Sequence, residues 1–516
     1  MSTLQEIIAK TPINVPEHNA NAVIIPHGPA FTSTGFLALV NRLRTDLASL
    51  NLPHQSAISI SLPNSLEFAV SFLAATFSGY IAAPLNSAYK KSEFEFYIDD
   101  LKSKLVIVTE GAVERNDPAV QAARTFNAAI AEVSFSATGT VVDFNLVERA
   151  GLKVSKFTSL PSAKFNDIAL VLHTSGTTGR PKAVPLTNLN LCTSIRNIVD
   201  TYNLSPKDTS YLVMPLFHVH GLMCGLLGAL ASGGAVIIPA KFSANNFWKD
   251  FIDYKANWYT AVPTIHQIIL KHPLPSPIPE IRFIRSCSSS LAPSVFHELE
   301  KRLYAPVLEA YAMTEASHQM TSNPLPPATR KPGSVGLGQG VEVVILDDKS
   351  SILPHGKTGE ISIRGKNVTL GYINNEKANA ESFTNGYFRT GDQGYKDEDG
   401  YVFITGRIKE LINRGGEKIS PIELDGLLLD IEGVAEAVSF AAPDEMYGQI
   451  VNAAIVLKPN YKGKVTSKDI QNAMANKVAK FKVPTSVFFT DVMPKTATGK
   501  IQRRKIAETF LSKPKL

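Results

Sequence analysis

The sequence predicts an α/β protein with a large N-terminal domain, in which helices flank the buried sheets of several sub-domains, and a small C-terminal α+β domain. Two observations predict this class. At 516 residues the chain exceeds what one hydrophobic core normally supports. Apolar strand-like runs also alternate with amphipathic helical stretches along most of the chain. Examples of these runs are IALVLH (168–173), AVIIPA (235–240) and IRFIRS (281–286).

The character of the chain changes near residue 406. A Gly-Arg-Ile-Lys-Glu turn is followed by the polar stretch Asn-Arg-Gly-Gly-Glu-Lys and then by a short βα pattern. Domain boundaries usually fall in polar, glycine-containing segments of this kind. We therefore expect an N-terminal domain over residues 1–405, a hinge at 406–409 and a C-terminal domain over 410–516.

The composition disfavours several classes of protein. With 44% hydrophobic and 19% charged residues, and a formal charge of +6 spread over the chain, it is typical of a globular protein for which nucleic acid is a poor candidate partner. Three cysteines without metal-ligand spacing indicate a reducing compartment. Residues 68–89 and 209–240 lack Asp, Glu, Lys and Arg, but proline and glycine interrupt both stretches. We expect them to be buried core, with no membrane span.

The most informative segment is a glycine-rich loop, His173-Thr-Ser-Gly-Thr-Thr-Gly-Arg-Pro-Lys182, between IALVLH and a second strand-like run, AVPLT. Its glycines let successive backbone N–H groups converge, and its hydroxyls add donors, so the loop can surround a polyphosphate. A Walker A loop would place Gly-Lys-Ser/Thr before a helix. Here Pro181 precedes Lys182 and a strand is expected to follow, so the sequence predicts a phosphate site of another kind.

The loop resembles the phosphate-binding signature of the adenylate-forming superfamily, which contains acyl-CoA synthetases, 4-coumarate–CoA ligases, luciferases and peptide-synthetase adenylation domains. Five further motifs continue the resemblance, in the family's order, over nearly the whole chain. They are LFHVHG (216–221), YAMTE (311–315), TGD (390–392), GRIKE (406–410) and PKTATGK (494–500). The resemblance implies an acid–CoA ligase that uses ATP to form an acyl-adenylate, releases pyrophosphate and AMP, and transfers the acyl group to coenzyme A.

The resemblance also implies which residues bind the nucleotide. The loop residues Thr174, Ser175, Gly176, Thr177, Thr178 and Lys182 would hold the β- and γ-phosphates. Thr314 would contact the α-phosphate and Glu315 would ligate Mg²⁺, a hard cation that suits one carboxylate plus phosphate oxygens. Tyr311 would lie against adenine, while Asp392 and Arg407 would lie at the ribose. Ser289, Glu309 and Ala310 complete the implied ATP site.

Catalysis and coenzyme A binding are likewise implied by matching positions. Lys500 would reach a bridging oxygen between the carboxylate and the α-phosphate, acting with Thr314, Glu315 and a gating His218. The resemblance implies a mobile C-terminal domain that rotates about Lys409 between the two half-reactions. In its second orientation, Arg414, Gly415 and Gly416 would form the mouth of the pantetheine tunnel. Lys241 matches a contact to coenzyme A phosphate.

The expected acid-binding wall departs from the common pattern of the family. Many relatives carry Ser-Gly-Gly-Ala-Pro where this chain has Ser286-Cys-Ser-Ser-Ser-Leu291. Serine hydroxyls disfavour a long fatty chain, because each buried donor without a partner costs about 1–3 kcal/mol. A small polar acid is therefore expected, and two histidines with an arginine would satisfy a second carboxylate. The expected acid-binding residues are His220, Arg285, Ser288, Ser289 and His318, and His318 would share a face with Glu315 if that segment were helical.

Three strings are similar to those of the oxalate–CoA ligases of plants and yeasts, namely TAVPTIHQIIL (260–270), IRSCSSSLAP (284–293) and EAYAMTEASH (309–318). They predict oxalate as the acid and oxalyl-CoA as the product. The alternatives are a medium-chain fatty acid or a 4-coumarate-type acid, a carrier-loading adenylation module, and a non-catalytic RNA-binding protein on this fold. The intact catalytic motifs count against the last.

The chain ends in Pro514-Lys515-Leu516. This tail resembles the peroxisomal address Ser-Lys-Leu, with proline in place of serine. We expect either a peroxisomal protein that binds the import receptor or a cytosolic one. The sequence leaves the oligomeric state open.

Overall fold

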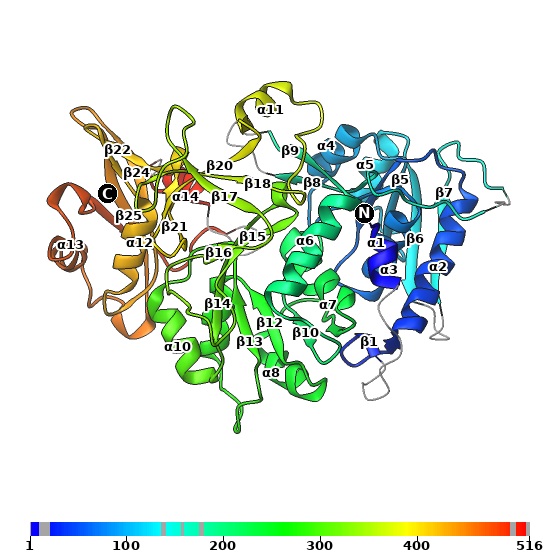
Figure 1. The fold of residues 1–516 in the computed structure, drawn as a ribbon, viewed down its shortest axis with the longest axis horizontal. Helices are drawn as coiled ribbons and strands as arrows, with labels where there is room; N and C mark the ends of the chain where they lie inside the picture. The colour runs from blue at the N-terminus through cyan, green and yellow to red at the C-terminus, as the bar shows by residue number, and fades with distance from the viewer. Residues whose placement is uncertain are drawn as a thin grey trace.

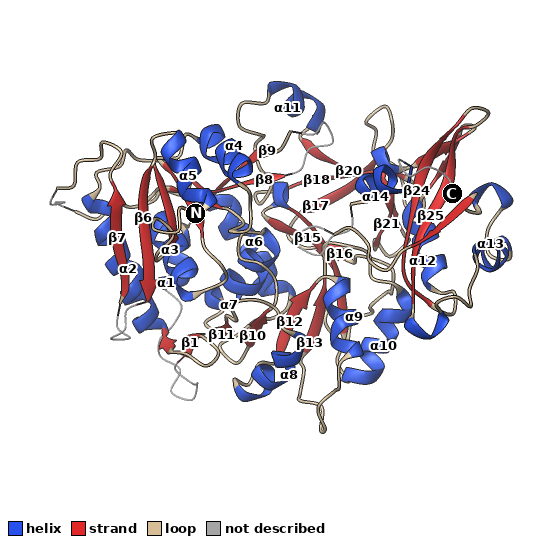
Figure 2. Ribbon diagram, turned by 180° about the vertical axis from the view of Figure 1, so that it is seen from behind, coloured by secondary structure: helices blue, strands red, loops and turns tan. Residues whose placement is uncertain are grey.

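A computed structural model of the chain describes residues 2–9, 21–135, 141–155, 159–174, 180–495 and 502–511. Within this part of the chain the strands form sheets of nine, seven, five and five strands, flanked by helices (Figures 1 and 2). The predicted α/β class is confirmed.

The seven-stranded sheet has the order β7-β6-β5-β3-β4-β8-β9 and is largely parallel. Its strands are β3 (Ala57–Ser61), β4 (Ile81–Pro84), β5 (Leu105–Thr109), β6 (Ala129–Phe135), β7 (Val142–Glu148), β8 (Ile168–Thr174) and β9 (Lys182–Thr187). Around it lie α1 (Leu4–Ala9), α2 (Ser33–Ser49), α3 (Leu66–Phe77), α4 (Lys91–Leu101) and α5 (Pro118–Thr125). The uncharged stretch 68–89 forms the buried α3 and β4, and no described helix is long and apolar enough to cross a membrane.

The nine-stranded sheet has the order β16-β15-β14-β13-β12-β10-β11-β1-β2. Its strands are β1 (Asn21–Ile24), β2 (Ala30–Thr32), β10 (Thr209–Leu212), β11 (Ala235–Ile237), β12 (Trp258–Ala261), β13 (Phe283–Ser286), β14 (Val307–Met313), β15 (His318–Ser322) and β16 (Leu337–Gly338). Its helices are α6 (Asn188–Thr201), α7 (Gly228–Ala231), α8 (Ala244–Asp253), α9 (Pro263–Lys271) and α10 (Pro293–Leu303). One hydrophobic core joins α3 and α6 with strands of both large sheets.

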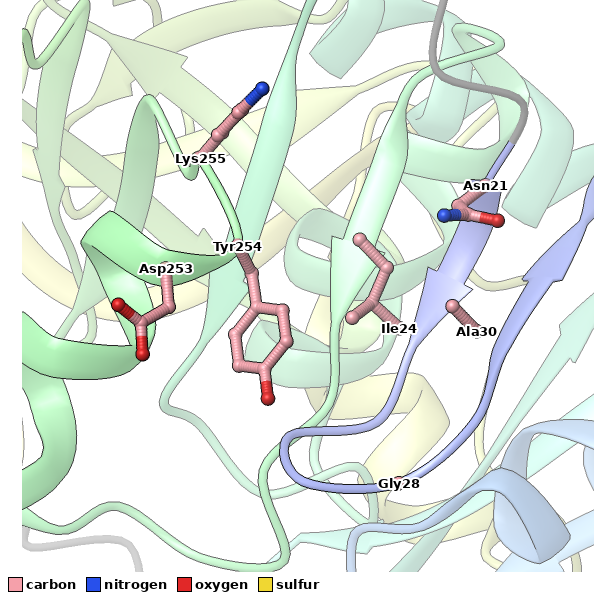
Figure 3. Close-up of a pocket in the computed structure, with 7 residues that line it drawn as sticks. All are labelled: Asn21, Ile24, Gly28, Ala30, Asp253, Tyr254 and Lys255. Atoms are coloured by element: carbon pink, nitrogen blue, oxygen red, sulfur yellow. The ribbon is translucent and has the colours of Figure 1, made fainter.

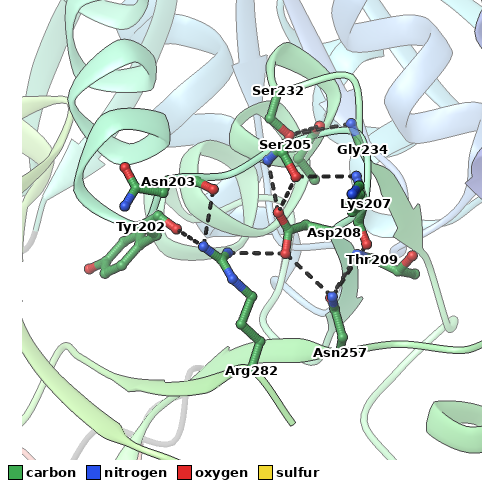
Figure 4. Close-up of polar contacts among 11 residues, drawn as sticks. Tyr202, Asn203, Ser205, Lys207, Asp208, Thr209, Ser232, Gly234, Asn257 and Arg282 are labelled. Carbon is green, nitrogen blue, oxygen red and sulfur yellow. Dashed lines mark hydrogen bonds and ion pairs between the residues drawn. The ribbon is translucent and has the colours of Figure 1, made fainter. Parts of the chain in front are cut away.

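Polar contacts tie together the N-terminal ends of three parallel strands of this sheet (Figure 4). Arg282, just before β13, pairs at 3.0 Å with Asp208, just before β10, and donates at 2.6 Å to the carbonyl of Tyr202 beyond α6. Asn257, just before β12, donates to Asp208 at 3.3 Å and accepts from the Thr209 N–H at 2.8 Å. The opposite, carboxyl ends of such strands are where open α/β sheets bind ligands.

The LFHVHG motif lies at that carboxyl end. After β10 the chain enters a π-helical turn, η1 (His220–Leu227), which continues into α7. Asn64 fixes the approach to this turn, because its side chain donates to the Met214 carbonyl at 3.0 Å and accepts from the Leu216 N–H at 2.8 Å. A Cβ on Gly221 would lie 2.3 Å from the Pro215 carbonyl oxygen, so this close approach requires glycine.

The third sheet is built from β17 (Glu342–Leu346), β18 (Gly359–Arg364), β19 (Phe383–Thr384), β20 (Tyr387–Lys396) and β21 (Val402–Arg407), with α11 (Glu376–Ser382) beside it. The fourth, C-terminal sheet contains β22 (Ile412–Arg414), β23 (Glu417–Ile419), β24 (Val434–Asp444), β25 (Gly448–Leu457) and β26 (Ser486–Phe489). It packs with α12 (Pro421–Leu429), α13 (Ser467–Ala475) and α14 (Arg503–Leu511) around separate apolar clusters.

A short 3₁₀ turn, η3 (Ile408–Glu410), connects the third and fourth sheets and carries Lys409. β21 itself continues through Gly406 and Arg407, which pair with β20. The Ser420 hydroxyl also donates to the Thr405 carbonyl across this junction. The division at 406–409 and the hinge at Lys409 stay predictions.

We predict that Gly221→Ala lowers the urea unfolding midpoint, because the new methyl group meets fixed carbonyl oxygens of Met214 and Pro215. Overpacking of this kind costs about 1–3 kcal/mol. Gly225→Ala in the same turn is the matched control, since its methyl group meets only the Leu212 Cδ1, which can rotate away. Equal losses in the two variants, measured by fluorescence in urea, would contradict the argument.

Candidate functional site

The glycine-rich loop joins two antiparallel strands. β8 and β9 pair from Ile168–Thr187 up to Thr174–Lys182, so the expected strand, and no helix, follows the loop. This confirms the prediction that separates the loop from a Walker A motif. The predicted phosphate ligands Ser175, Gly176, Thr177 and Thr178 lie outside the described residues. The described ends of the hairpin nevertheless fix where the loop begins and ends.

Glu315 lies directly against the start of this loop. It sits in a one-turn 3₁₀ helix, η2 (Thr314–Ala316), and its side chain is buried. Its Oε1 accepts from the Tyr372 hydroxyl at 2.9 Å and from the Thr174 hydroxyl at 3.4 Å. The Lys182 ammonium lies 4.4 Å from the centre of the Tyr372 ring. A carboxylate and a cation therefore both contact Tyr372 beside the predicted phosphate site.

The segment before α11 holds this arrangement together. The Thr369 N–H donates to the Glu315 carbonyl at 2.7 Å, and its hydroxyl donates to the Pro185 carbonyl at 2.8 Å. The Ile373 N–H donates to the Ala183 carbonyl at 3.0 Å. Tyr372 and Thr369 were not among the predicted site residues. A single Gly-Tyr dipeptide more than 50 positions after Glu315 carries no local signal of this contact.

The residues around Glu315 fit a magnesium ion that arrives with a nucleotide. Among the described residues, no three or more His, Cys, Asp or Glu side chains form a group that could hold a metal. Mg²⁺, however, is commonly bound by one or two carboxylates together with substrate phosphates. Glu315 supplies one such carboxylate, and its hydroxyl partners can turn away from it. We expect Glu315 to be the protein ligand.

A second cluster joins three motifs at the predicted ribose position. The Tyr311 hydroxyl donates to Asp392 Oδ2, and Arg407 Nε lies 3.3 Å from Asp392 Oδ1. Burial raises the pKa of Tyr311 above its usual range, so its hydroxyl keeps the proton that it donates. A carboxylate offers about four acceptor positions, which leaves capacity for ribose hydroxyls. The nucleotide roles of Tyr311, Asp392 and Arg407 stay predictions.

Glu309 connects the predicted adenine side to the acid wall. It is buried within β14, and its Oε1 accepts from the Gly333 N–H at 2.8 Å. Burial raises its pKa to about 8, against hydrogen bonds from the backbone of Gly333 and Leu291 that lower it. Glu309 therefore connects β14 to Gly333 and to Leu291, which ends the serine run. Ala310 follows it in β14 and pairs with Ser322.

The predicted acid wall forms a hydrogen-bonded cluster. His220 is fully buried; its Nδ1 lies 3.0 Å from Ser288 Oγ and its Nε2 lies 2.6 Å from Thr260 Oγ1. His218 lies beside it and accepts from the His220 N–H at 3.2 Å. The Ser289 side chain is exposed and donates to the Ser288 carbonyl at 2.8 Å. Thr260 was absent from the predicted set.

His318 reaches this cluster by another route than the one expected. The segment is not a helix that would bring residues 315 and 318 to one face: η2 ends at Ala316, Ser317 is left-handed, and His318 begins β15. The His318 ring stacks on His220, with centroids 5.3 Å apart and an interplanar angle of 26°. Both of its ring nitrogens are buried, and neither has a hydrogen-bond partner within the part of the chain that the structure describes. Such groups point to a ligand that satisfies them.

Arg285 lies behind the histidines and is fully buried. Its guanidinium donates to Tyr202 Oη at 2.7 Å, Thr260 Oγ1 at 3.1 Å and Gln319 Oε1 at 3.3 Å. It also lies 3.5 Å from His220 Nε2. All of these acceptors are neutral, so the positive charge adds to the field at the acid wall.

The residues predicted to contact coenzyme A lie apart in the chain. Gly415 and Gly416 form the β22–β23 turn with φ of 59° and 96°, a conformation that favours glycine. Arg414 lies over the Tyr447 ring at 4.8 Å and donates to the Phe481 carbonyl at 2.6 Å. Lys241 is exposed beyond β11. Their roles stay predictions.

A separate hollow opens between the β1–β2 turn and the end of α8 (Figure 3). It is lined by Asn21, Ile24, Gly28, Ala30, Asp253, Tyr254 and Lys255. None of the predicted site residues lines it. It lies at the opposite end of the nine-stranded sheet from β14 and β15, so it belongs to neither cluster described above.

A phosphate-type hairpin against a buried carboxylate, together with a mixed α/β core and a small appended domain, defines a nucleotide-binding enzyme class. The sequence profile of the AMP-binding enzyme family matches residues 14–373, and that of the AMP-binding enzyme C-terminal domain matches residues 423–500. The chain belongs to the AMP-binding enzyme family, and the predicted membership of the adenylate-forming superfamily is confirmed.

Two relatives and one solved structure specify the likeness. The chain is 53% identical to oxalate–CoA ligase of Saccharomyces cerevisiae, with 95% of this chain and 94% of that protein covered. It is 48% identical to oxalate–CoA ligase of Arabidopsis thaliana, with 92% and 93% covered. It is also similar to O-succinylbenzoate coenzyme A synthetase from Bacillus subtilis, solved with ATP and magnesium ion, at 25% identity, a TM-score of 0.82 and coverage of 97% and 98%.

Two further predictions concern residues outside the described ranges. Lys500 and the tail Pro514-Lys515-Leu516 belong to this group, so the adenylation lysine and the peroxisomal or cytosolic location stay predictions. The three cysteines, by contrast, are described, and all are buried and free of disulfides.

We predict that the acid sensitivity of the fold depends on His318. Burial lowers the pKa of His318 and of His220 well below 6.5, and the nearby Arg285 charge adds to this effect. The unfolded chain therefore binds more protons, and stability that is present above pH 6.5 is lost as the pH falls below it. Between pH 7 and 5.5, one such histidine costs about 1 kcal/mol.

His318→Gln should remove this contribution, so that its urea midpoint falls less than that of the wild type between pH 7 and 5.5. His355→Gln, at an exposed position, is the control and should follow the wild type. Parallel pH dependence in the wild type and His318→Gln would argue against a neutral buried His318.

Proposed function

We propose that the chain is an ATP-dependent acid–CoA ligase whose acid is oxalate and whose product is oxalyl-CoA. The observation that carries this proposal is the acid wall. Two buried histidines stack beside a buried arginine, and both ring nitrogens of one histidine lack a partner among the described residues. A second carboxylate satisfies such a wall, whereas an alkyl chain leaves it unpartnered. The 53% and 48% identities to two oxalate–CoA ligases support the same acid.

In the first half-reaction, one oxygen of the acid's carboxylate attacks the α-phosphorus of ATP, a C–O–P linkage forms, and pyrophosphate leaves. Lys182 and the loop beside it would neutralise the departing phosphates, and Glu315 would hold Mg²⁺, which supplies further positive charge there. Asp392 and Tyr311 would orient the nucleoside. Lys500 would stabilise the developing charge on the bridging oxygen.

The acid wall would orient the substrate during this step. The histidine cluster lies at the carboxyl ends of β12 and β13, and the nucleotide motifs lie on β14 and η2 in the same sheet. A small acid bound by its distal carboxylate would direct its other carboxylate towards the α-phosphate. Holding both reactants in this way supplies much of the rate enhancement expected of such an enzyme.

In the second half-reaction, the coenzyme A thiol loses its proton to solvent and its sulfur attacks the acyl carbon, so that the bond to AMP breaks. Contacts of the small domain support its movement as one body. Arg503, three residues after Lys500 in the sequence, pairs with Glu410 at 3.2 Å and with the partly buried Asp425 at 2.9 Å. This links the lysine-bearing end of the chain to the residue just beyond the predicted hinge.

A panel of acids tests the proposed substrate. With ATP, Mg²⁺ and coenzyme A, the purified protein should release AMP far faster with oxalate than with malonate, octanoate or 4-coumarate. Discrimination by buried polar groups left unpaired reaches about 10⁴-fold in enzymes built to recognise them. A preference for octanoate or 4-coumarate would reject oxalate and favour the fatty-acid or cinnamic-acid alternative. Absence of any acid-dependent release would favour a non-catalytic protein.

Lys500→Ala separates the two half-reactions. We expect it to abolish oxalate-dependent ATP–pyrophosphate exchange, at a cost of about 3–4 kcal/mol in transition-state stabilisation. Supplied oxalyl-adenylate should still react with coenzyme A, which thioester formation measures. Lys505→Ala, an exposed lysine in α14, is the control for removing a charge from the same end of the chain. Equal loss of both half-reactions would contradict the assignment of Lys500.

A further inference from the structure

Arg282 and Arg285, just before and within β13, differ in the groups that neutralise their positive charge. Arg282 has a carboxylate partner, Asp208, at the N-terminal end of the sheet. Arg285 is fully buried near the carboxyl end, and its guanidinium contacts the neutral acceptors Tyr202, Thr260, Gln319 and His220. Burying a charge without an opposite charge is costly. The chain therefore keeps a positive charge beside the acid wall without cancelling it.

Thr260 connects this charge to the wall. Thr260 in β12 and Arg285 in β13 are direct partners in the strand register, so the two side chains leave the sheet on the same side. An arginine can only donate, so Thr260 Oγ1 accepts from Arg285 NH1 at 3.1 Å. The hydroxyl hydrogen of Thr260 then remains available for His220 Nε2, 2.6 Å away.

These contacts decide which nitrogen of His220 carries its proton. Nε2 faces two donors, the Thr260 hydroxyl and, at 3.5 Å, the Arg285 guanidinium, so it acts as an acceptor. Burial lowers the pKa of His220, which leaves the ring neutral with one proton. The positive guanidinium on the Nε2 side favours the proton on Nδ1, from which it would be donated to Ser288 Oγ, 3.0 Å away. The hydrogen of the Ser288 hydroxyl is then free to serve another acceptor.

The backbone of Ser288 has an unusual conformation. Its φ is +74°, a left-handed conformation that non-glycine residues rarely adopt and that costs about 1–2 kcal/mol. A glycine would avoid this cost, but it would have no hydroxyl. Strain of this kind is typical of functional positions. This backbone conformation places the Ser288 hydroxyl at the end of the series of hydrogen bonds that starts at Arg285.

We propose that Arg285 and Thr260 are positioning residues that hold His220 with its proton on Nδ1, so that the Ser288 hydroxyl donates to the distal carboxylate of the bound acid. The inference rests on the proposed function for the identity of that acid. Arg285 acts through Thr260 and does not contact the substrate. Its far side is anchored by Tyr202 and Gln319, whose side chains also bond each other at 2.9 Å.

The test substitutes Thr260, because removing a buried arginine can prevent folding. Thr260→Val keeps the shape and removes the hydroxyl, whereas Thr260→Ser keeps the hydroxyl. We expect Thr260→Val to lower kcat/KM for oxalate at least about tenfold, the effect of one lost hydrogen bond to a charged group, mainly through KM. Thr260→Ser and the KM for ATP should stay near the wild type. Thr321→Val, which removes a buried hydroxyl bonded to the Val335 carbonyl, is the control.

The second measurement needs no substrate. In protein labelled with ¹⁵N-histidine, long-range ¹H–¹⁵N correlation spectra distinguish the two tautomers, and His220→Gln identifies the signal. We expect Nδ1-protonated His220 in the wild type and Thr260→Ser, and a shift towards Nε2 protonation in Thr260→Val. Nε2-protonated His220 in the wild type, or an unchanged KM for oxalate in Thr260→Val, would overturn the relay.

The two proposals fail in different ways. Wild-type protein with Nδ1-protonated His220 but no oxalate-dependent pyrophosphate exchange would overturn the proposed function, and with it the role of Ser288 towards oxalate. Robust oxalate activity with Nε2-protonated His220 would overturn the relay alone.

Discussion

The buried guanidinium of Arg285, which is hydrogen-bonded to neutral groups, is the constraint on which the predicted acid site depends. A charge in such a place must be held by several acceptors, or the side chain would leave the core. Strands β12 and β15 and the end of α6 each contribute one of them. The hydrogen bonds that offset the cost of burying Arg285 also fix Thr260 and, through it, His220. A substitution that weakens them should therefore affect both folding stability and acid binding.

The two ends of the parallel strands divide these tasks. At the N-terminal ends, Arg282, Asp208 and Asn257 form a network in which the charges are paired, which fixes the strands relative to one another. Near the carboxyl ends, the two buried ring nitrogens of His318 have no hydrogen-bond partner among the residues that the structure describes, so they can bind a ligand. A bound dianion would bring negative charge near Arg285, as Asp208 does for Arg282 at the opposite strand ends. Ligand binding should therefore stabilise the fold, as it does whenever a ligand binds only the native state.

Sequence reasoning succeeded where the signal is local. The β8–β9 hairpin was predictable because apolar runs flank a glycine-rich loop. The roles of Thr260 and Tyr372 were not, because their partners lie 40 and 57 positions away in the chain. The helical placement of His318 was wrong because the left-handed Ser317 ends the turn after one residue triplet. Periodicity arguments hold only within a continuous element.

Ion pairs hold the elements of the small C-terminal domain together. Arg503 joins α14, which follows Lys500, to Asp425 in α12 and to Glu410 in the turn after β21. Asp425 also accepts from the Ser439 N–H in β24, so helix, strand and turn all contact one partly buried ion pair. If the predicted hinge at Lys409 operates, α12, β24 and α14 would move together, because these contacts hold them to one another.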